Sequence, residues 1–420
     1  MAGIAIRGCE LARALGEHAD VTLAAARVKG PTTDLGLRVV AFDRHDARTL
    51  AGLLEGVDAV IAQPQWPLVA RALRRSRARL VYDLSGPEPL EALETHAGRA
   101  AFRRRAASAL TVDRLADALR DGHHFLASSH RQVDLWLGAM LGERLLTPSG
   151  YDADPSLASR MALVPHGLPD EPPRRTDGHG LRDRIPAIGD GDEVVLWNSA
   201  IWRWLDAGTA IRGVALLATR RPRVRLVIMS RADQPEHVSP IEGARRLAAE
   251  LGVLDRHVFF HDGWVPYAQR ASWLLDADCA LACHDHHLET RFSFRTRYLD
   301  CFWAGLPLVC TEGDVLADRV DREGLGMTVP AGDPQAVADA LDAVLARGRG
   351  AYAEPLARAA ADYTWSRAAR PLVELLLGPA PPAPLGDGVP RRPGHALRSA
   401  AYIAAKTALN GAGIGEWPRL

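Results

Sequence analysis

Two carboxylates and three guanidinium groups gather in one short stretch of the chain, at Glu289, Arg291, Arg295, Arg297 and Asp300. The stretch follows an apolar strand pattern and leads into a helical pattern, so these charges surround a helix N-terminus. Free N–H groups and the helix dipole favour an anion there, and arginine contacts phosphate through two parallel hydrogen bonds. The spacing therefore predicts a phosphate-binding site; the alternative is a set of salt bridges on a polar helix face.

A second anion-binding element follows the next expected strand. Gly313 and Asp314 form a turn after the apolar run Leu308–Thr311, and this turn offers further backbone N–H groups. Because parallel strands end at the same edge of a sheet, the turn should lie beside the charged stretch. Two such elements at one edge favour the phosphate site over surface salt bridges.

Cysteines and histidines crowd together just before the charged stretch and suggest a competing zinc site, at Cys279, Cys283, His284, His286 and His287. The two cysteines, however, lie within an apolar strand pattern, and no second pair stands at zinc-finger spacing. Free cysteine buried in a strand is common. We therefore predict no metal site and interpret the histidines as polar lining of the loop.

The composition of the 420 residues is that of a soluble globular protein with two domains. Of these residues, 47% are hydrophobic and 24% are charged, and 51 basic side chains balance 51 acidic ones. This balance argues against a nucleic-acid partner, and no apolar run is long enough for an integral membrane protein. The five cysteines do not describe a disulfide framework, and Arg7 and Glu10 interrupt what would be a secretory signal. We expect a cytoplasmic protein.

Short β-branched runs alternate with helical patterns along the chain, which is typical of parallel sheets. In the first half the expected strands are Val21–Ala26, Arg38–Phe42, Ala59–Gln63, Leu80–Leu84, His124–Ser128 and Ala162–Pro165. In the second half they are Val194–Trp197, Val224–Met229, Val258–His261, Cys279–Cys283, Leu308–Thr311 and Met327–Val329. The pattern predicts an α/β protein with two doubly wound sheets in tandem, whose ligands bind at the carboxyl ends of the strands.

Composition shifts divide the chain into four parts. We expect a first domain over residues 1–172, a linker rich in Pro, Gly and Asp over 173–191, and a second domain over 192–377. Residues 378–420 are expected to form a Pro/Gly-rich tether and a short helix. The chain opens directly on a glycine-containing loop and a helix, without the buried strand that usually precedes them. We expect that strand to lie upstream, with Met1 as an internal methionine.

Four stretches in this order resemble one protein family. They are GWVPYAQRASWLLDADCAL, LDCFWAGLPLVCTEGD, MTVPAGDPQAVADALDAVL and YTWSRAARPLVELL. They are similar to segments of the retaining nucleotide-sugar glycosyltransferases of glycosyltransferase family 4, and the resemblance extends up to Leu377. It implies the GT-B fold, in which two Rossmann-like domains face each other across a cleft.

The resemblance assigns roles to part of the charged stretch. Aligned on Gly305-Leu306-Pro307, the family glutamate that holds the nucleotide ribose corresponds to Asp300. The family's other glutamate, which faces the donor sugar, corresponds to Phe292, so the paired motif is broken. Glu289 in the same loop is the candidate for the missing carboxylate.

Other branches of the family carry a serine followed by basic residues at this place. Ser293, Arg295 and Arg297 resemble that variant, so the resemblance places them at the donor diphosphate. The family's basic pair near the first strand of the second domain is absent, and Arg203 or Arg231 would have to serve.

In the first domain the resemblance points to three residues. Gly3 lies in the loop that approaches the donor phosphates in this family, where a missing side chain lets the backbone come close. Arg7, one turn into the next helix, could reach the same anion. Asp83 ends a strand and is expected to contact the acceptor, while a cap or a loop hydrogen bond is the alternative.

The resemblance implies transfer of a sugar from a nucleotide-diphosphate sugar to an acceptor hydroxyl, with retention and without a metal or other cofactor. The acceptor stays open among glycans, lipid-linked molecules and small molecules. Two alternatives remain: another GT-B nucleotide-sugar enzyme, such as an epimerase or a sugar-phosphate synthase, and a binding protein that has lost activity. For the C-terminal helix, peripheral contact with the inner face of a membrane stands beside docking on the protein surface or disorder.

Overall fold

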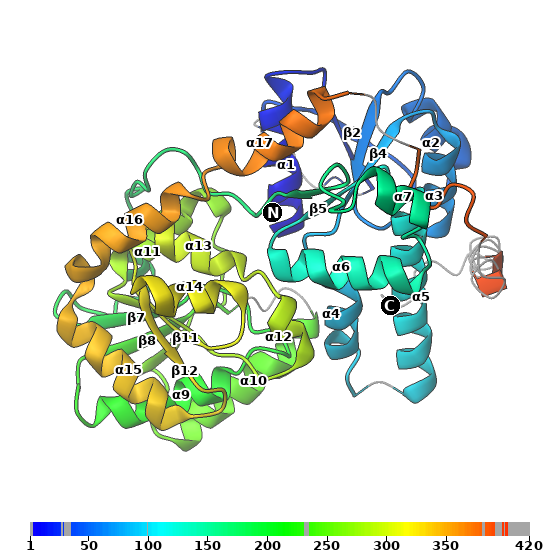
Figure 1. The fold of residues 1–420 in the computed structure, drawn as a ribbon. Helices are drawn as coiled ribbons and strands as arrows, with labels where there is room; N and C mark the ends of the chain where they lie inside the picture. The colour runs from blue at the N-terminus through cyan, green and yellow to red at the C-terminus, as the bar shows by residue number, and fades with distance from the viewer. Residues whose placement is uncertain are drawn as a thin grey trace. The chain divides into compact units, whose positions relative to one another are not determined.

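The computed structural model describes residues 3–26, 28, 35–98, 100–230, 235–379, 383–390, 397–398 and 400–401. The chain forms two compact units (Figure 1). Unit 1 comprises Met1–Ile6 and His166–Ala368, and unit 2 comprises Arg7–Pro165 and Ala369–Leu420.

The boundaries differ from those expected, because the segment 173–191 is not a free linker. It contains a short helix, α8 (Leu181–Arg184), and Leu181 and Ile188 are buried in the core of unit 1. The backbone N–H of Leu181 also donates to Asp276 at 2.8 Å. The boundaries therefore fall before His166 and after Ala368 rather than at residues 172 and 377.

A six-stranded sheet forms the centre of unit 1, with the order β12-β11-β10-β7-β8-β9. The strands are β7 (Glu193–Trp197), β8 (Val224–Ile228), β9 (Val258–Phe260), β10 (Cys279–Ala282), β11 (Leu308–Thr311) and β12 (Gly326–Val329). Every pairing between them is parallel. The doubly wound sheet predicted for the second half of the chain is therefore confirmed.

Helices connect the strands of unit 1. They are α9 (Ala207–Ala218), α10 (Pro235–Glu250), α11 (Arg270–Asp276), α12 (Leu288–Phe292), α13 (Thr296–Trp303), α14 (Val315–Glu323), α15 (Pro334–Arg347), α16 (Ala353–Ala361) and α17 (Trp365–Leu377), of which α17 continues into unit 2. Aspartates fix three helix starts, because the side chains of Asp206, Asp314 and Asp333 accept N–H bonds in the first turns of α9, α14 and α15. Gly324 ends α14 with a φ of 65°.

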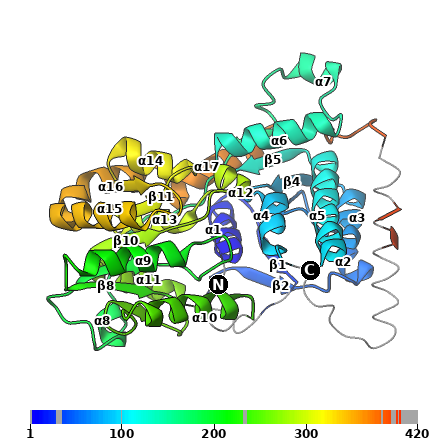
Figure 2. The ribbon, with the colours of Figure 1, turned by 90° about the horizontal axis from the view of Figure 1, so that it is seen from below.

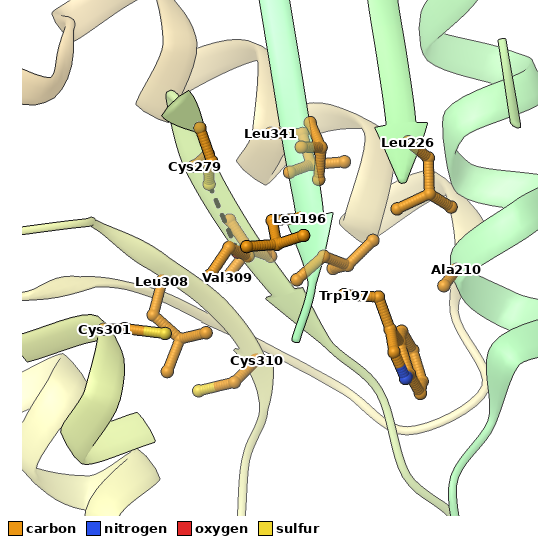
Figure 3. Packing of buried hydrophobic residues seen from close by; sticks show 14 of the residues in the cluster. Leu196, Trp197, Ala210, Leu226, Cys279, Cys301, Leu308, Val309, Cys310 and Leu341 are labelled. Atoms are coloured by element: carbon orange, nitrogen blue, oxygen red, sulfur yellow. Dashed lines mark hydrogen bonds between the residues drawn. The ribbon is translucent and has the colours of Figure 1, made fainter. Parts of the chain in front are cut away.

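Cysteines fill part of the core of unit 1. Figure 3 shows Cys279, Cys301 and Cys310 packed around Leu308 and Val309. Burial raises the pKa of the Cys279 thiol above its ordinary value. Among the residues that the structure describes, no group of three His, Cys, Asp or Glu side chains is placed to hold a metal ion.

Unit 2 contains two parallel sheets. The first pairs β1 (Thr22–Ala25) with β2 (Arg38–Ala41), and the second has the order β3-β4-β5-β6. The strands of the second are β3 (Ala59–Ala62), β4 (Arg79–Asp83), β5 (His124–Ala127) and β6 (Met161–Leu163). All six strands expected in this half are confirmed, and the expected strand upstream of Met1 stays a prediction.

Helices surround these sheets. They are α1 (Gly3–Gly16), whose first residues belong to unit 1, and α2 (Ala47–Leu53), α3 (Pro67–Arg75), α4 (Glu88–Thr95), α5 (Ala101–Asp121), α6 (His130–Gly142) and α7 (Pro148–Ala153). The longest of these helices, α5, has an apolar face built largely of alanine and an arginine-rich first half.

The C-terminal segment docks on unit 2 where a free tether was expected. The backbone N–H of Leu385 donates to Gly122 O at 3.0 Å, and that of Gly386 donates to Arg120 O at 2.8 Å. Val389 and Leu385 pack against the core of this unit. The apolar Leu and Val among the prolines drive this docking. Of the expected helix 396–408, only residues 397–398 and 400–401 are described.

No described helix is both long enough and apolar enough to cross a membrane.

Candidate functional site

The strand order of unit 1 creates a crevice between the loops that follow β7 and β10. From the central strand β7, the chain moves outward to β8 and β9 and then returns to β10 on the other side. Ligands of doubly wound sheets bind at this switch point. The two loops are joined there, because Asp206 N donates to Cys283 O at 2.9 Å and Leu205 forms an antiparallel bridge with His284.

A pocket of about 340 Å³ opens beside these loops. Trp202, Arg203 and Asp206 line it from the loop after β7, and Asp285 lines it from the loop after β10. Trp202 is 38% exposed and stacks on Trp204 with 5.1 Å between ring centroids. The structure thus places Arg203 in a pocket at the switch point. Arg231, the other predicted basic residue, lies outside the described residues.

Glu289 is buried on α12, beside this crevice. Its Oε2 accepts a 2.8 Å hydrogen bond from Arg295 Nη2, and His287 Nδ1 lies 3.7 Å away. The sequence grouped Glu289 with Arg295, and the structure brings them together. Within the described part of the chain, the buried Arg295 Nε has no hydrogen-bond partner. Arg295 therefore keeps one donor that an anion could take.

Asp300 is held by two arginines on α13 and α11. Its Oδ1 accepts from Arg270 Nε at 2.9 Å, and its Oδ2 accepts from Arg297 Nη1 at 3.2 Å. Burial acts to raise the pKa of this carboxyl, but the charges of Arg270 and Arg297 outweigh it and hold the pKa below its ordinary value. Asp300 is therefore ionised, and both of its oxygens already have a partner.

Arg270 is a member of this cluster that sequence reasoning missed. Its guanidinium carbon lies 3.5 Å from the ring centroid of Tyr267 and 4.6 Å from that of Trp303, so two aromatic faces clamp it. Its Nη2 is buried without a hydrogen-bond partner among the described residues. Arg270 lies thirty positions before Asp300, so only the tertiary structure pairs them.

The turn after β11 lies against the loop after β10, as the sequence predicted. Gly313 has a φ of 110°, which glycine adopts without strain, and a Cβ there would lie 3.6 Å from Thr290 Cγ2. Ser293 is buried at the end of α12, and its N–H donates to Thr290 O at 3.2 Å. Gly313 and Ser293 thus flank Thr290 on one sheet edge.

A buried His–Asp contact lies between the loop after β10 and the start of α14. His284 Nε2 lies 3.5 Å from Asp314 Oδ2, and both residues are at most 1% exposed. The other oxygen of Asp314 accepts from Leu316 N and Ala317 N at the start of α14. The two side chains thus lie next to each other, and neither His284 Nε2 nor Asp314 Oδ2 has a hydrogen-bond partner among the described residues.

The sequence predicts three site residues in the first domain, at Gly3, Arg7 and Asp83. Gly3 is the first residue of α1 rather than part of a loop, and a Cβ there would meet no atom within 4 Å. Its approach to donor phosphates stays a prediction. Arg7 forms a buried pair with Asp83, with bonds of 2.7 and 3.0 Å, and also donates to Val164 O and Pro165 O. This pair joins α1 to the ends of β4 and β6. An acceptor contact of Asp83 stays a prediction.

Comparisons with known proteins agree with this architecture. Residues 193–347 match the family model described as glycosyl transferases group 1. A glycosyltransferase from Rickettsia africae ESF-5 matches 90% of this chain and 96% of its own, with 11% identity and a TM-score of 0.61. HepE from Anabaena, in complex with UDP and glucose, matches 89% of this chain and 96% of its own, with 14% identity and a TM-score of 0.64.

Sucrose-phosphate synthase from Thermosynechococcus elongatus is also similar, with 15% identity over 89% of this chain and 92% of its own, and a TM-score of 0.59. No curated protein matches the sequence. The fold is that of GT-B glycosyltransferases, with two Rossmann-like units. The family match lies in the unit that carries the candidate site, and the enzyme is a glycosyltransferase.

Proposed function

We propose that the protein transfers a glycosyl group from a nucleotide-diphosphate sugar to an acceptor hydroxyl, with retention of configuration and without a metal, as a member of glycosyltransferase family 4. The observation that carries this proposal is the gathering of paired charges at the switch point of unit 1. Glu289 with Arg295 and Asp300 with Arg270 and Arg297 lie on the loops and helices that open there. HepE was solved with UDP-glucose, which supports a donor of this chemical class.

The arginines would carry most of the catalytic effect. When the bond from the anomeric carbon to the phosphate oxygen breaks, negative charge grows on the leaving diphosphate. The acceptor oxygen forms the new bond to that carbon, and its proton passes to the phosphate oxygen, which becomes basic. Arg295, Arg297 and Arg203 would stabilise this charge, with Gly313 and Ser293 shaping the backbone around it. Glu289 would face the donor sugar.

Both oxygens of Asp300 accept hydrogen bonds from arginines, so Asp300 would contact the ribose only after one arginine moves away. Arg297 is the partner that can move, because its side chain is 42% exposed while that of Arg270 is 9% exposed. When Arg297 turns to the diphosphate, Oδ2 of Asp300 becomes free to accept from a ribose hydroxyl. The exposed guanidinium and the buried carboxylate would thus bind two neighbouring parts of one donor.

A second candidate function is a GT-B binding protein without activity. Phe292 at the place of a family glutamate favours it. An epimerase would instead convert the nucleotide sugar without an acceptor. The acceptor, whether a glycan, a lipid-linked molecule or a small molecule, and a cytoplasmic location remain proposals.

The test is a thermal-shift screen against uridine, guanosine, adenosine and thymidine diphosphate sugars. One donor should raise the Tm by several degrees at saturation, since ligand at about a hundred times Kd adds about 2.7 kcal/mol of stability. Asp300→Ala should abolish the shift relative to its own ligand-free Tm, while the exposed control Asp190→Ala keeps it. No shift with any donor, in a folded sample, would contradict the proposal.

Turnover separates the two candidates once the donor is known. Mass spectrometry of a glycosylated acceptor, with the anomeric configuration read by NMR, would establish transfer and retention. Donor binding without transfer or donor conversion across an acceptor panel would favour the inactive binder.

A further inference from the structure

Helix α4 and the first half of α5 form a hairpin that extends beyond the sheets of unit 2 (Figure 1). The two helices lie side by side in both views (Figures 1 and 2). No residue of α4 is buried, and burial on α5 begins at Ala107 and becomes continuous only from Leu115 onward. We call residues 93–98 and 100–109 the hairpin tip. The second half of α5 anchors this tip in the core of unit 2 through Leu115 and Leu119.

The hairpin tip exposes an aromatic ring beside consecutive arginines. Phe102 is 69% exposed, and Arg103 and Arg105 are also exposed. The Arg103 guanidinium lies 5.7 Å from the Phe102 ring centroid. An exposed phenylalanine ring is stabilised when it moves from water into an apolar environment. The tip thus presents one large apolar side chain beside exposed, positively charged side chains.

A groove of about 530 Å³ runs along the hairpin tip. Leu93, Ala101 and Ala109 contribute apolar lining, and Arg104 and Arg105 contribute basic lining. Arg104 also donates to Leu93 O at 3.0 Å, which fixes α5 against the end of α4. A lining that is partly apolar and partly basic matches an amphiphile whose head is anionic.

The net charge of the hairpin tip is positive. Its acidic side chain is Glu94, and Glu91 lies one turn earlier on α4. The arginines at 103, 104 and 105 outnumber them, and the sequence holds a further arginine at 99 between the two helices. The surface is therefore complementary to a negatively charged partner.

We propose that the hairpin tip docks on the surface of an anionic lipid bilayer. Phe102 would enter the headgroup region, and Arg103 and Arg105 would contact lipid phosphates. Interfacial helices combine apolar insertion with electrostatic attraction in this way, and each basic residue near an anionic membrane strengthens the attraction. The site differs from the C-terminal helix considered in the sequence, where Arg398 is paired with Asp113 of α5.

Co-sedimentation with vesicles tests the docking. The full chain should bind vesicles of phosphatidylcholine mixed with phosphatidylglycerol, bind pure phosphatidylcholine far less, and lose affinity as salt rises. The double change Arg103→Glu and Arg105→Glu should weaken binding about thirtyfold or more. Phe102→Ser should weaken it about tenfold, because the apolar insertion is lost.

The matched control is Arg71→Glu with Arg75→Glu, which changes the same charge on exposed residues of α3. It should bind vesicles within about threefold of the wild type. Equal binding of the wild type and the hairpin double variant would overturn the proposal, as would equal loss in the control or no binding to anionic vesicles. Circular dichroism checks that each variant is folded. The proposed donor site lies in unit 1, so the donor should still raise the Tm of the hairpin variants. Loss of vesicle binding can therefore be distinguished from failure of the proposed glycosyl transfer.

Discussion

Three buried carboxylates, Glu289, Asp300 and Asp83, each hold an arginine. A buried charge is costly unless it is paired, so the arginine offsets the cost of burying the carboxylate and fixes its position. The consequences differ among the three pairs. Asp83 is fully occupied by Arg7, whereas Asp300 has one partner, Arg297, that reaches into solvent. A ligand that attracts Arg297 therefore finds a preformed carboxylate behind it.

Asp300→Asn should destabilise the protein by about 3 kcal/mol at neutral pH, because it leaves the buried Arg270 without a counter-charge. The pKa of Asp300 lies below its ordinary value of 3.8 in the folded state, so its stabilisation is complete above that value. It is lost as the pH falls through the lower, folded-state pKa. Urea unfolding of both proteins from neutral pH down to pH 3.5 should show a difference that shrinks only at the acid end. A difference that is absent at neutral pH, or constant throughout, would contradict this account.

Among the elements, α11 and α13 must be held in place, because they carry Arg270 and Asp300. Arg349, on the short 3₁₀ turn after α15, caps the C-terminal ends of both. It donates to Ala277 O at 2.6 Å and Leu274 O at 3.0 Å after and within α11, and to Gly305 O at 3.0 Å after α13. Free carbonyls at helix ends need such donors.

Arg349→Ala should therefore lower the free energy of unfolding by about 3 kcal/mol, since several charge-assisted hydrogen bonds to half-buried carbonyls are lost together. Guanidinium chloride denaturation followed by tryptophan fluorescence measures this change. Arg358→Ala is the control: it removes an exposed arginine that forms an ion pair with Glu354 and should cost less than about 0.5 kcal/mol. Equal effects of the two substitutions would show that Arg349 does not hold these helices.

At the scale of the whole molecule, the chain crosses between the units near Leu168 and near Trp365. Hydrogen bonds join these two segments within unit 1. Leu168 N donates to Tyr363 O at 2.6 Å, and Trp365 N donates to Leu168 O at 2.8 Å. His166 packs edge-on against the Trp365 ring at 4.9 Å. Gly167 lies beneath that ring, and a Cβ there would collide with it. The chain thus leaves and re-enters unit 1 through one bonded pair of segments.

Gly167→Ala should cost about 2 kcal/mol of stability, because the ring must move and strain these bonds. Thermal unfolding should show the loss, and Gly189→Ala, where the nearest atom lies 3.9 Å from the added Cβ, should show almost none. An unchanged Tm for Gly167→Ala would mean that the Trp365 ring moves aside without loss.

The sequence by itself determined the strands, their parallel arrangement and the charged loop after β10. These follow from local patterns, since alternating apolar runs and helix starts depend on neighbouring residues. The same local reasoning placed Gly3 in a loop and 173–191 in a linker, both of which the structure corrects.

Only the tertiary structure decided which distant residues contact each other. Arg270 reaches Asp300, Arg7 reaches Asp83, and Leu385 docks on the core of unit 2, far earlier in the chain. The unit boundary at His166 and the exposed hairpin tip at Phe102 likewise emerge from packing. The physical reason is that a local pattern fixes which face of an element is apolar, whereas the partner of a buried charge depends on which distant elements the folded core brings within a few ångströms.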